Sequence, residues 1–381
     1  MKKQLPFFWR FYKPGKSGAT TVTEDQTPAS DEQERGETAE LGVWATNIGR
    51  EAVNTVPPIP KLPPTASLYE SEQEPEDASD IARHPHQKIF PPEGGTYRLR
   101  NGWQVAGASR RGFSHTYNGK YREDDFGIGV INDEGVIVAI ADGLGSREYS
   151  RRGALAAVEG TISLPMEKLQ NLLALVQAQP DDSHCQKEAY AVLMAALQAA
   201  HANIEQQAEC DQLDSSELKT TLLVFVAIPC QDDTLFVASV QVGDGALLAL
   251  RPHEQAALSD QWSWLQQQQI QEIGSAVQPF LGTNATLWSK FFRCEVLHHA
   301  TLIMGMTDGT ADDIEPPRTA PDDPNPDPFF FVQDFYQYLA ERVLLAEHPA
   351  RALLEFLGYR KRSSFDDRTV VCFYYGEEFT R

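Results

Sequence analysis

The chain has 381 residues, of which 41% are apolar and 10% aromatic, so it is long enough for one large domain with an appendage or for two smaller domains. Its 33 Lys and Arg residues are outnumbered by 54 Asp and Glu residues, which gives a formal net charge of -21. This excess of negative charge excludes a general nucleic-acid binder, which needs basic residues for the phosphates. No apolar run approaches the roughly 20 residues of a membrane span, so we expect no transmembrane segment.

The five cysteines are scattered along the chain, and none of them are spaced as C-x-x-C. Their odd number and their spacing argue against a disulfide framework and against a cysteine-ligated zinc site. This pattern is typical of a reducing compartment, and we therefore expect a cytoplasmic protein.

Residues 1–96 are predicted to form a disordered tail. The tail opens with a short basic and aromatic arm, which has five basic residues and no acidic residue up to Lys16. Ser17–Asp80 carries 14 acidic residues against three basic ones, and 12 of the 24 prolines precede Thr96. Such a composition buries too little apolar surface to offset chain entropy. Because its prolines favour an extended conformation, the tail is a candidate docking segment for a partner protein.

Residues 97–381 are predicted to form one folded domain of mixed α and β structure. In chain order, the hydrophobic periodicity first predicts strands over Trp103–Ala108, Asp125–Ile131 and Gly135–Ala141, followed by helices over Ser150–Thr161 and Gln186–Ala208. It then predicts four strands, over Thr221–Ile228, Thr234–Val242, Ala246–Leu250 and Leu297–Thr307. Helices over Phe329–Ala346 and Ala350–Leu357 and a strand over Thr369–Tyr375 complete the domain. The acidic, proline-rich stretch Asp308–Pro328 is predicted to be a loop. This order of elements fits an α+β domain better than an alternating doubly wound sheet.

Acidic residues recur at the ends of the predicted strands. Four such clusters are Glu123-Asp124-Asp125, Asp142-Gly143, Asp308-Gly309 and Asp366-Asp367. An isolated Asp-Gly pair is most simply an ordinary turn. Carboxylates that gather without Lys or Arg partners repel one another, however, unless hard cations such as Mg²⁺ or Mn²⁺ neutralise them. The four clusters together therefore predict a metal site at the strand ends.

The ordered motifs resemble those of the PPM (type 2C) metal-dependent Ser/Thr protein phosphatases, in a form similar to bacterial members. The matching motifs are Glu123-Asp124-Asp125, Ala141–Ser146, Lys219-Thr220-Thr221, Val242–Gly245, Thr307-Asp308-Gly309 and Asp366–Thr369. The resemblance implies a four-layer αββα sandwich, in which two antiparallel sheets are flanked by helices and a metal cleft lies at one edge. It also implies hydrolysis of phosphoserine and phosphothreonine in proteins by a water that two Mn²⁺ or Mg²⁺ ions activate. The substrates would then be phosphoproteins supplied by a cognate Ser/Thr kinase.

The resemblance implies a role for each acidic residue of the site. Asp142 matches the ligand that two metal ions share, and the Gly143 carbonyl matches an additional ligand. Asp308 and Asp366 match ligands of the second ion. Asp124 matches the carboxylate that positions the attacking water.

Three positions depart from the family pattern or leave alternatives open. Asp244 matches a residue that can hold a third, weaker ion, but a Gly-Asp-Gly hairpin turn also forms without metal. Leu144 stands where many eukaryotic members have a histidine, so the leaving group would take its proton from water or from another group such as His115. Eukaryotic members also have an arginine that holds the substrate phosphate. His115 stands near that place, and Arg111 or Arg122 are alternatives.

Two functions from different classes compete for this sequence. Retention of Asp142, Asp308 and Asp366 favours a phosphatase. Leu144 and the unassigned arginine keep open the alternative of a pseudophosphatase that binds phosphoproteins without turnover. A structural cation-binding protein is disfavoured, because no EF-hand loop occurs in the sequence.

Overall fold

The computed structural model describes residues 81, 83–251, 262–266, 288–314, 335–336, 338–359 and 364–376. All of them belong to the unit Pro57–Arg381. The predicted disordered tail lies outside the described residues up to position 80, and there it stays a prediction. Among the described helices, none is both long and apolar enough to cross a membrane.

One antiparallel sheet has five described strands in the spatial order β10-β7-β6-β5-β4. The strands are β4 (Asp125–Ile131), β5 (Gly135–Ala141), β6 (Leu222–Pro229), β7 (Thr234–Val242) and β10 (Phe292–His298). In β5, Val136, Val138 and Ile140 face the core between the two sheets. Ile137 and Ala139 face the opposite way, toward the helices. The strand is apolar along its whole length because both of its faces are covered.

The second antiparallel sheet has seven strands among the described residues, in the order β1-β3-β12-β11-β8-β9, with β2 paired to β3. The strands are β1 (Gln87–Phe90), β2 (Tyr97–Arg98), β3 (Trp103–Arg110), β8 (Ala246–Leu250), β9 (Trp262–Gln266), β11 (Leu302–Met306) and β12 (Arg368–Tyr375). Met306 at the end of β11 pairs with Ala246 of β8 and with Val370 of β12. This register brings the residues just beyond Met306 and just before β8 and β12 to one end of the sheet.

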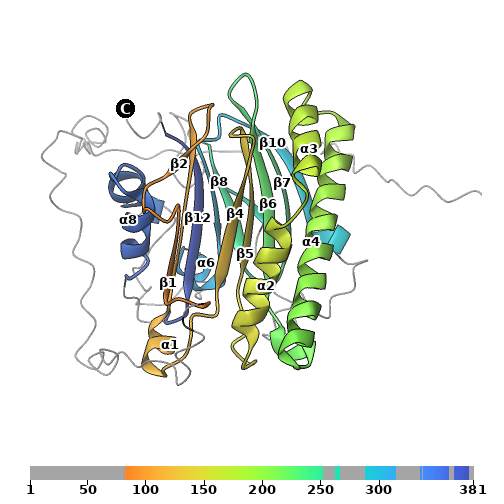
Figure 1. Cartoon of the computed structure of the whole chain (residues 1–381). Coiled ribbons are helices and arrows are strands. Elements are labelled where there is room, and N and C mark those ends of the chain that lie inside the picture. The colour runs from red at the N-terminus through yellow and green to blue at the C-terminus, as the bar shows by residue number, and fades with distance from the viewer. Residues whose placement is uncertain are drawn as a thin grey trace, which may run out of the picture. The chain divides into compact units, whose positions relative to one another are not determined.

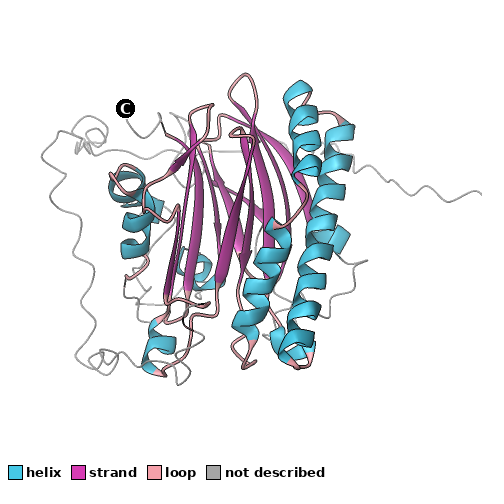
Figure 2. Cartoon of the chain, in the orientation of Figure 1, coloured by secondary structure: helices cyan, strands magenta, loops and turns pink. Residues whose placement is uncertain are grey.

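Helices cover the outer face of each sheet (Figures 1 and 2). The five-stranded sheet is covered by α2 (Ser150–Ile162), α3 (Met166–Ala178) and α4 (Ser183–Asp211). The other sheet is covered by α6 (Asp308–Ile314), the π-helical η7 (Leu339–Leu344) and α8 (Pro349–Phe356). Side chains such as Phe126, Phe225 and Phe373 fill the space between the sheets. The predicted αββα sandwich is confirmed.

Three segments differ from their predictions. Residues 87–90, which we placed in the tail, form β1 and pair with β3, so strand structure is present before the predicted boundary at residue 97. The run Leu297–Thr307 forms the end of β10 and all of β11, with His299 between them at a φ of 56°. Asp308, predicted to open a loop, opens α6 instead, and the rest of that stretch from residue 315 lies outside the described residues.

Candidate metal centre

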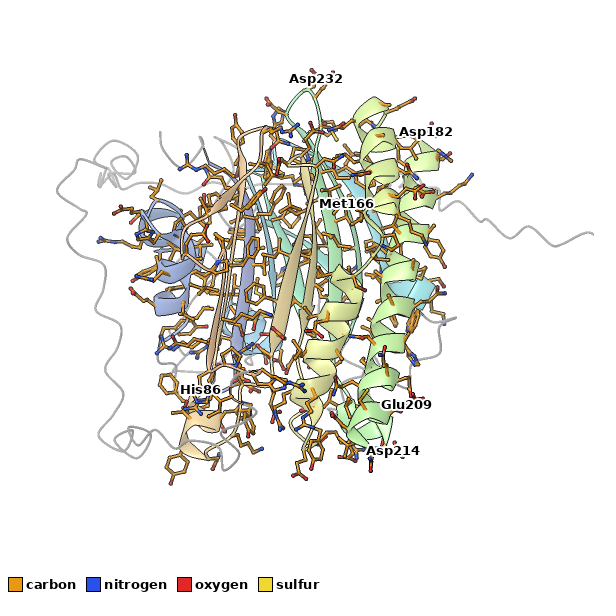
Figure 3. The ribbon with its side chains drawn as sticks, viewed as in Figure 1. His86, Met166, Asp182, Glu209, Asp214 and Asp232 are labelled. Atoms are coloured by element: carbon orange, nitrogen blue, oxygen red, sulfur yellow. The ribbon has the colours of Figure 1, made fainter. Side chains whose placement is uncertain are left out.

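The strand ends that carry the predicted acidic residues meet at one end of the two sheets. Ala141 at the end of β5 pairs with Asp125 at the start of β4, which places Asp142 beside Asp124. The register of β8, β11 and β12 brings three further aspartates to the same end, namely Asp244, Asp308 and Asp366. Figure 3 shows His86 at this end, beside α1 (Phe113–Tyr117), and Asp232 at the opposite end.

Asp142, Asp244 and Asp308 form a group in which one carboxylate oxygen of each lies within 4.8 Å of those of the other two. Within the described part of the chain, none of the three forms an ion pair with Lys or Arg. The Oδ1 atom of Asp244 is buried and accepts no hydrogen bond from a described residue. A donor set made only of carboxylate oxygens, with no balancing side-chain charge, fits a hard cation such as Mg²⁺ or Mn²⁺.

Burial and mutual repulsion raise the pKa values of this group. Burial, followed by the charges of Asp308 and Asp124, holds the pKa of Asp142 well above its ordinary value. Burial together with Asp244 raises the pKa of Asp308 to about 7. Burial also raises the pKa of Asp244 to about 6, with Asp312 as the strongest repelling charge. A divalent cation would oppose these shifts, because it favours the ionised carboxylates.

Asp366 lies near this group but outside it. Its side chain is exposed, and it belongs to a second group together with His115 and Asp367. Its charge nevertheless contributes to the raised pKa values of Asp142 and Asp308. The structure therefore brings Asp366 to the same edge as Asp308 without placing its carboxylate among the three clustered ones.

Asp124 connects the two sheets through its side chain. It immediately precedes β4, and its Oδ2 atom accepts hydrogen bonds from the hydroxyl groups of Thr307 at 2.8 Å and Thr369 at 2.7 Å. Asp124 is buried, and this burial raises the pKa of its carboxyl well above the ordinary value, with Asp367 adding to the shift. Because both threonines belong to the seven-stranded sheet or its edge, they hold the carboxylate of Asp124 in one orientation across the gap between the sheets.

The Lys219-Thr220-Thr221 motif holds the backbone around Asp142. The N–H of Asp142 donates to the hydroxyl of Thr221 at 3.1 Å. The carbonyl of Asp142 accepts from the N–H of Thr221 at 2.8 Å and from the hydroxyl of Thr220 at 2.7 Å. The N–H of Leu144 donates to the carbonyl of Lys219 at 3.0 Å. This motif, which immediately precedes β6, therefore fixes the position of Asp142.

Gly143 occupies a crowded position next to Asp142. Its N–H donates to the carbonyl of Glu123 at 3.2 Å, and a Cβ atom here would lie 2.8 Å from the backbone of Ser150. The buried side chain of Glu123 in turn accepts a hydrogen bond from the hydroxyl of Ser150 at 3.3 Å. Only glycine fits such a close approach. The role of the Gly143 carbonyl as a metal ligand stays a prediction.

His115 lies on α1, in the segment that leads to Asp124. Its Nδ1 atom is 3.0 Å from Oδ1 of Asp367. Burial acts to lower the pKa of His115, but the charge and hydrogen bond of Asp367, together with the charges of Glu123 and Asp366, outweigh burial and raise the pKa to about 9. At neutral pH His115 is therefore a cation that is paired with Asp367.

Asp367 was not among the predicted site residues. Besides pairing with His115, its carboxylate accepts hydrogen bonds from the N–H of Gly112 at 2.6 Å and the N–H of Glu123 at 2.5 Å. Both of its oxygens are thus engaged, so Asp367 joins the start of β12 to the segment that carries Asp124. The adjacent pair Asp366-Asp367 signals this position in the sequence, but the partners of Asp367 lie too far away along the chain to be inferred.

The two arginines that we considered as phosphate contacts are buried. Arg122 is 2% exposed, and its guanidinium donates to the Pro85 carbonyl at 2.8 Å, to the Ser109 hydroxyl at 2.8 Å and to the carbonyl of Asp124. Arg111 donates to the carbonyl of Lys120 at 3.2 Å. These contacts give Arg122 a structural role beside Asp124, and a phosphate contact from Arg111 or Arg122 stays an untested alternative.

Comparisons with known proteins give one family match and several similar solved structures. The family profile described as protein phosphatase 2C matches residues 111–358. One similar solved structure is PppA, described as a key regulatory component of T6SS in Pseudomonas aeruginosa. It is 16% identical to this chain with a TM-score of 0.44, and the match covers 71% of this chain and 97% of PppA. A serine-threonine phosphatase 2C from Toxoplasma gondii is 13% identical with a TM-score of 0.47, covering 76% and 99% of the respective chains. A comparison with curated proteins gives no significant match.

Proposed function

This chain belongs to the protein phosphatase 2C family, which is metal-dependent, and we propose that it hydrolyses phosphoserine and phosphothreonine in proteins. The observation that carries the proposal is the group formed by Asp142, Asp244 and Asp308, whose carboxylates converge without a Lys or Arg partner in the described chain. Such a group is unfavourable in its ionised form unless cations neutralise it. We infer that it exists to hold metal ions.

The ligands follow from the positions of the aspartates. Asp142 would be shared between two ions of Mn²⁺ or Mg²⁺, with the Gly143 carbonyl beside it. Asp308 and Asp366 would bind the second ion, and Asp244 would hold a third ion. When bound, such ions bring the pKa of a coordinated water toward neutrality and neutralise the phosphoryl oxygens. A chain with a net charge of -21 attracts phosphate poorly by itself, so the aspartates act by holding positive charge at this edge.

Asp124 and His115 supply the remaining functions of the site. The hydrogen bonds from Thr307 and Thr369 fix Asp124, so its carboxylate can orient the attacking water and accept a proton from it. His115 carries a positive charge because of Asp367, and it would contact the substrate phosphoryl group. Since Leu144 offers no proton, either solvent or His115 would protonate the leaving group.

The substrates are proposed to be phosphoproteins made by a Ser/Thr kinase that acts in the same cell, with the N-terminal tail as a docking segment. The five cysteines are all unpaired thiols in the structure, which supports the proposed location in the reducing cytoplasm.

The proposal is tested by phosphate release from a phosphothreonine peptide with Mn²⁺ and with chelator. The wild-type chain should release phosphate only with the metal, and Asp142→Asn should lose nearly all of this activity. Asp182→Asn is a matched control, because it makes the same acid-to-amide change at the N-cap of α4, at the other end of the sheets. This variant should keep the wild-type rate.

The same samples separate the enzyme from the pseudophosphatase. A wild-type chain that binds the phosphopeptide but releases no phosphate at any Mn²⁺ concentration would establish the binding module, the alternative that Leu144 keeps open. Equal rates for wild type and Asp142→Asn would reject the proposed metal ligand.

A further inference from the structure

A buried ionic network lies behind the candidate metal centre, and none of its members belongs to the predicted site. Arg368, Asp313 and Tyr359 are each at most 2% exposed. The Nε atom of Arg368 lies 3.4 Å from Oδ2 of Asp313, and the Tyr359 hydroxyl donates to the same oxygen at 2.5 Å. The Arg368 guanidinium also stacks over the Tyr359 ring, 3.9 Å from its centre. The three side chains therefore form one connected unit.

This network joins α6, the start of β12 and the segment after α8, and the first two of these adjoin proposed metal ligands. Asp313 lies on α6, the helix that begins at Asp308, and Arg368 begins β12, two residues after Asp366. Tyr359 follows α8 and accepts, through its carbonyl, a hydrogen bond from Arg368 at 2.7 Å. The network thus connects the two segments that carry the proposed ligands of the second ion.

The same two segments are in direct contact at their ends. A Cβ atom on Gly309 would lie 2.0 Å from the carbonyl oxygen of Asp367, so α6 rests against the turn before β12. The hydroxyl of Ser364 donates to the carbonyl of Gly309 at 3.3 Å, and Arg368 donates to the carbonyl of Ser364 at 3.1 Å. A shift of α6 relative to this turn would therefore change the separation between Asp308 and Asp366.

Stability alone is a weak explanation for a buried ion pair, because apolar residues of similar volume are often as stabilising. An ion pair with several directed hydrogen bonds does, however, fix the relative positions of the elements that carry it. We propose that Arg368, Asp313 and Tyr359 are positioning residues, which set the separation of Asp308 and Asp366 and thereby the affinity for the second metal ion. This inference rests on the proposed function, because it takes both aspartates as metal ligands.

The test compares two buried tyrosines of the full-length chain. Tyr359→Phe removes the hydroxyl that donates to Asp313 and keeps the ring under Arg368. Tyr374→Phe is the matched control, since Tyr374 is 1% exposed on β12 and its hydroxyl contacts Thr96 at 3.3 Å, away from the metal centre. Mn²⁺ binding is measured by calorimetry, and unfolding by denaturant is measured on the same metal-free samples.

We expect Tyr359→Phe to weaken Mn²⁺ binding at the affected site by about tenfold, the lower end for residues that orient metal ligands. Tyr374→Phe should bind Mn²⁺ like the wild type, even where its unfolding free energy falls by as much as that of Tyr359→Phe. Asp313→Asn is a second variant, which keeps the side-chain shape and removes the charge, and it should also weaken Mn²⁺ binding.

Three outcomes would overturn the inference. Wild-type Mn²⁺ affinity in both Tyr359→Phe and Asp313→Asn would show that the network does not position the ligands. Equal weakening in Tyr359→Phe and Tyr374→Phe would show an effect of stability alone. A wild-type chain that binds no Mn²⁺ would instead reject the proposed function, and the positioning role with it.

Discussion

At the scale of single residues, the carboxylates of Asp142, Asp244 and Asp308 lie within 4.8 Å of one another with no balancing Lys or Arg among the described residues. In the metal-free chain this arrangement opposes folding whenever the groups are ionised, as their raised pKa values indicate. Neutralising a single member should relieve the repulsion and at the same time remove a metal ligand. Stability and activity should therefore respond in opposite directions.

Asp308→Asn should leave the metal-free fold as stable as the wild type or more stable. The reason is that the amide carries no charge, so it no longer repels Asp142 and Asp244. Each kcal/mol of repulsion removed should raise the Tm by about 2–4 °C. Calorimetric melting with chelator measures this change, and a clearly lower Tm would show that the Asp308 carboxylate holds the fold together even without metal.

The stability of the metal-free chain should fall as the pH rises from about 5 to about 8. In the folded state the pKa of Asp308 is about 7 and that of Asp244 is about 6, whereas in the unfolded state both lie near the ordinary value of about 3.9. Between the unfolded-state and folded-state pKa values, the folded chain therefore binds more protons than the unfolded chain. The stability that these protons contribute is lost as the pH rises through the folded-state pKa values. Thermal melts across this range with chelator measure the trend. A Tm that rises over the same interval would contradict the assigned burial of these groups.

The sequence was sufficient to locate residues that follow or precede an apolar strand, such as Asp142 and Asp308. It was not sufficient for residues whose role depends on distant partners. Arg122 was an alternative for the phosphate contact, yet it is buried against Pro85 and Ser109, which lie elsewhere in the sequence. Asp367 was named in an acidic cluster but given no role, since its contacts with Gly112 and Glu123 exist only after β12 has docked beside β3.

At the scale of elements, regular hydrophobic periodicity predicted most of the central strands and the helices α2 and α4. The missed segments carry a weaker pattern or depend on non-local pairing. β10 alternates polar and apolar residues at the edge of its sheet, and β1 lies in a proline-rich stretch and owes its conformation to pairing with β3. α6 is short and rich in aspartate, and it is held by the burial of Ala311 and Ile314. The spacing of Leu169, Leu172, Leu173 and Val176 did signal α3, which we had not predicted.

The contact between α6 and the turn before β12 predicts the effect of a single methyl group. Gly309→Ala would place Cβ 2.0 Å from the carbonyl oxygen of Asp367, so the helix must move. We expect a loss of about 1–3 kcal/mol in the unfolding free energy, typical of overpacking. Gly145→Ala is the control, because its Cβ would lie 3.7 Å from the nearest atom, Oε2 of Glu123. Denaturant melts that give both variants the same midpoint would refute the close contact.

At the scale of the whole molecule, the start of the folded domain lies earlier than the sequence suggested. β1 pairs with β3, Lys88 forms an ion pair with Asp125 at 2.6 Å, and Arg122 donates to the carbonyl of Pro85. The segment before residue 97 thus contacts the region that leads into the metal centre. The division into a tail and a domain stays a prediction, with its boundary moved toward residue 83.

A chain shortened to residues 83–381 should unfold cooperatively with the Tm of the full-length chain, because the predicted tail contributes little to the core. A chain shortened further, to 97–381, should have a lower Tm, since it loses β1 and the contacts of Pro85 and Lys88. Calorimetric melting of the three chains distinguishes these cases. Equal Tm values for the two shortened chains would mean that β1 does not stabilise the domain.

The claim on which the whole account depends is that the converging aspartates hold metal ions, and Mn²⁺ binding to the full-length chain tests it most directly. Electron paramagnetic resonance of a Mn²⁺ titration at room temperature reports the free ion, so binding appears as a loss of that signal. We predict that the wild-type chain removes free Mn²⁺ and that Asp142→Asn, although folded, removes far less. An undiminished signal with the wild type, or equal loss with wild type and Asp142→Asn, would contradict the account.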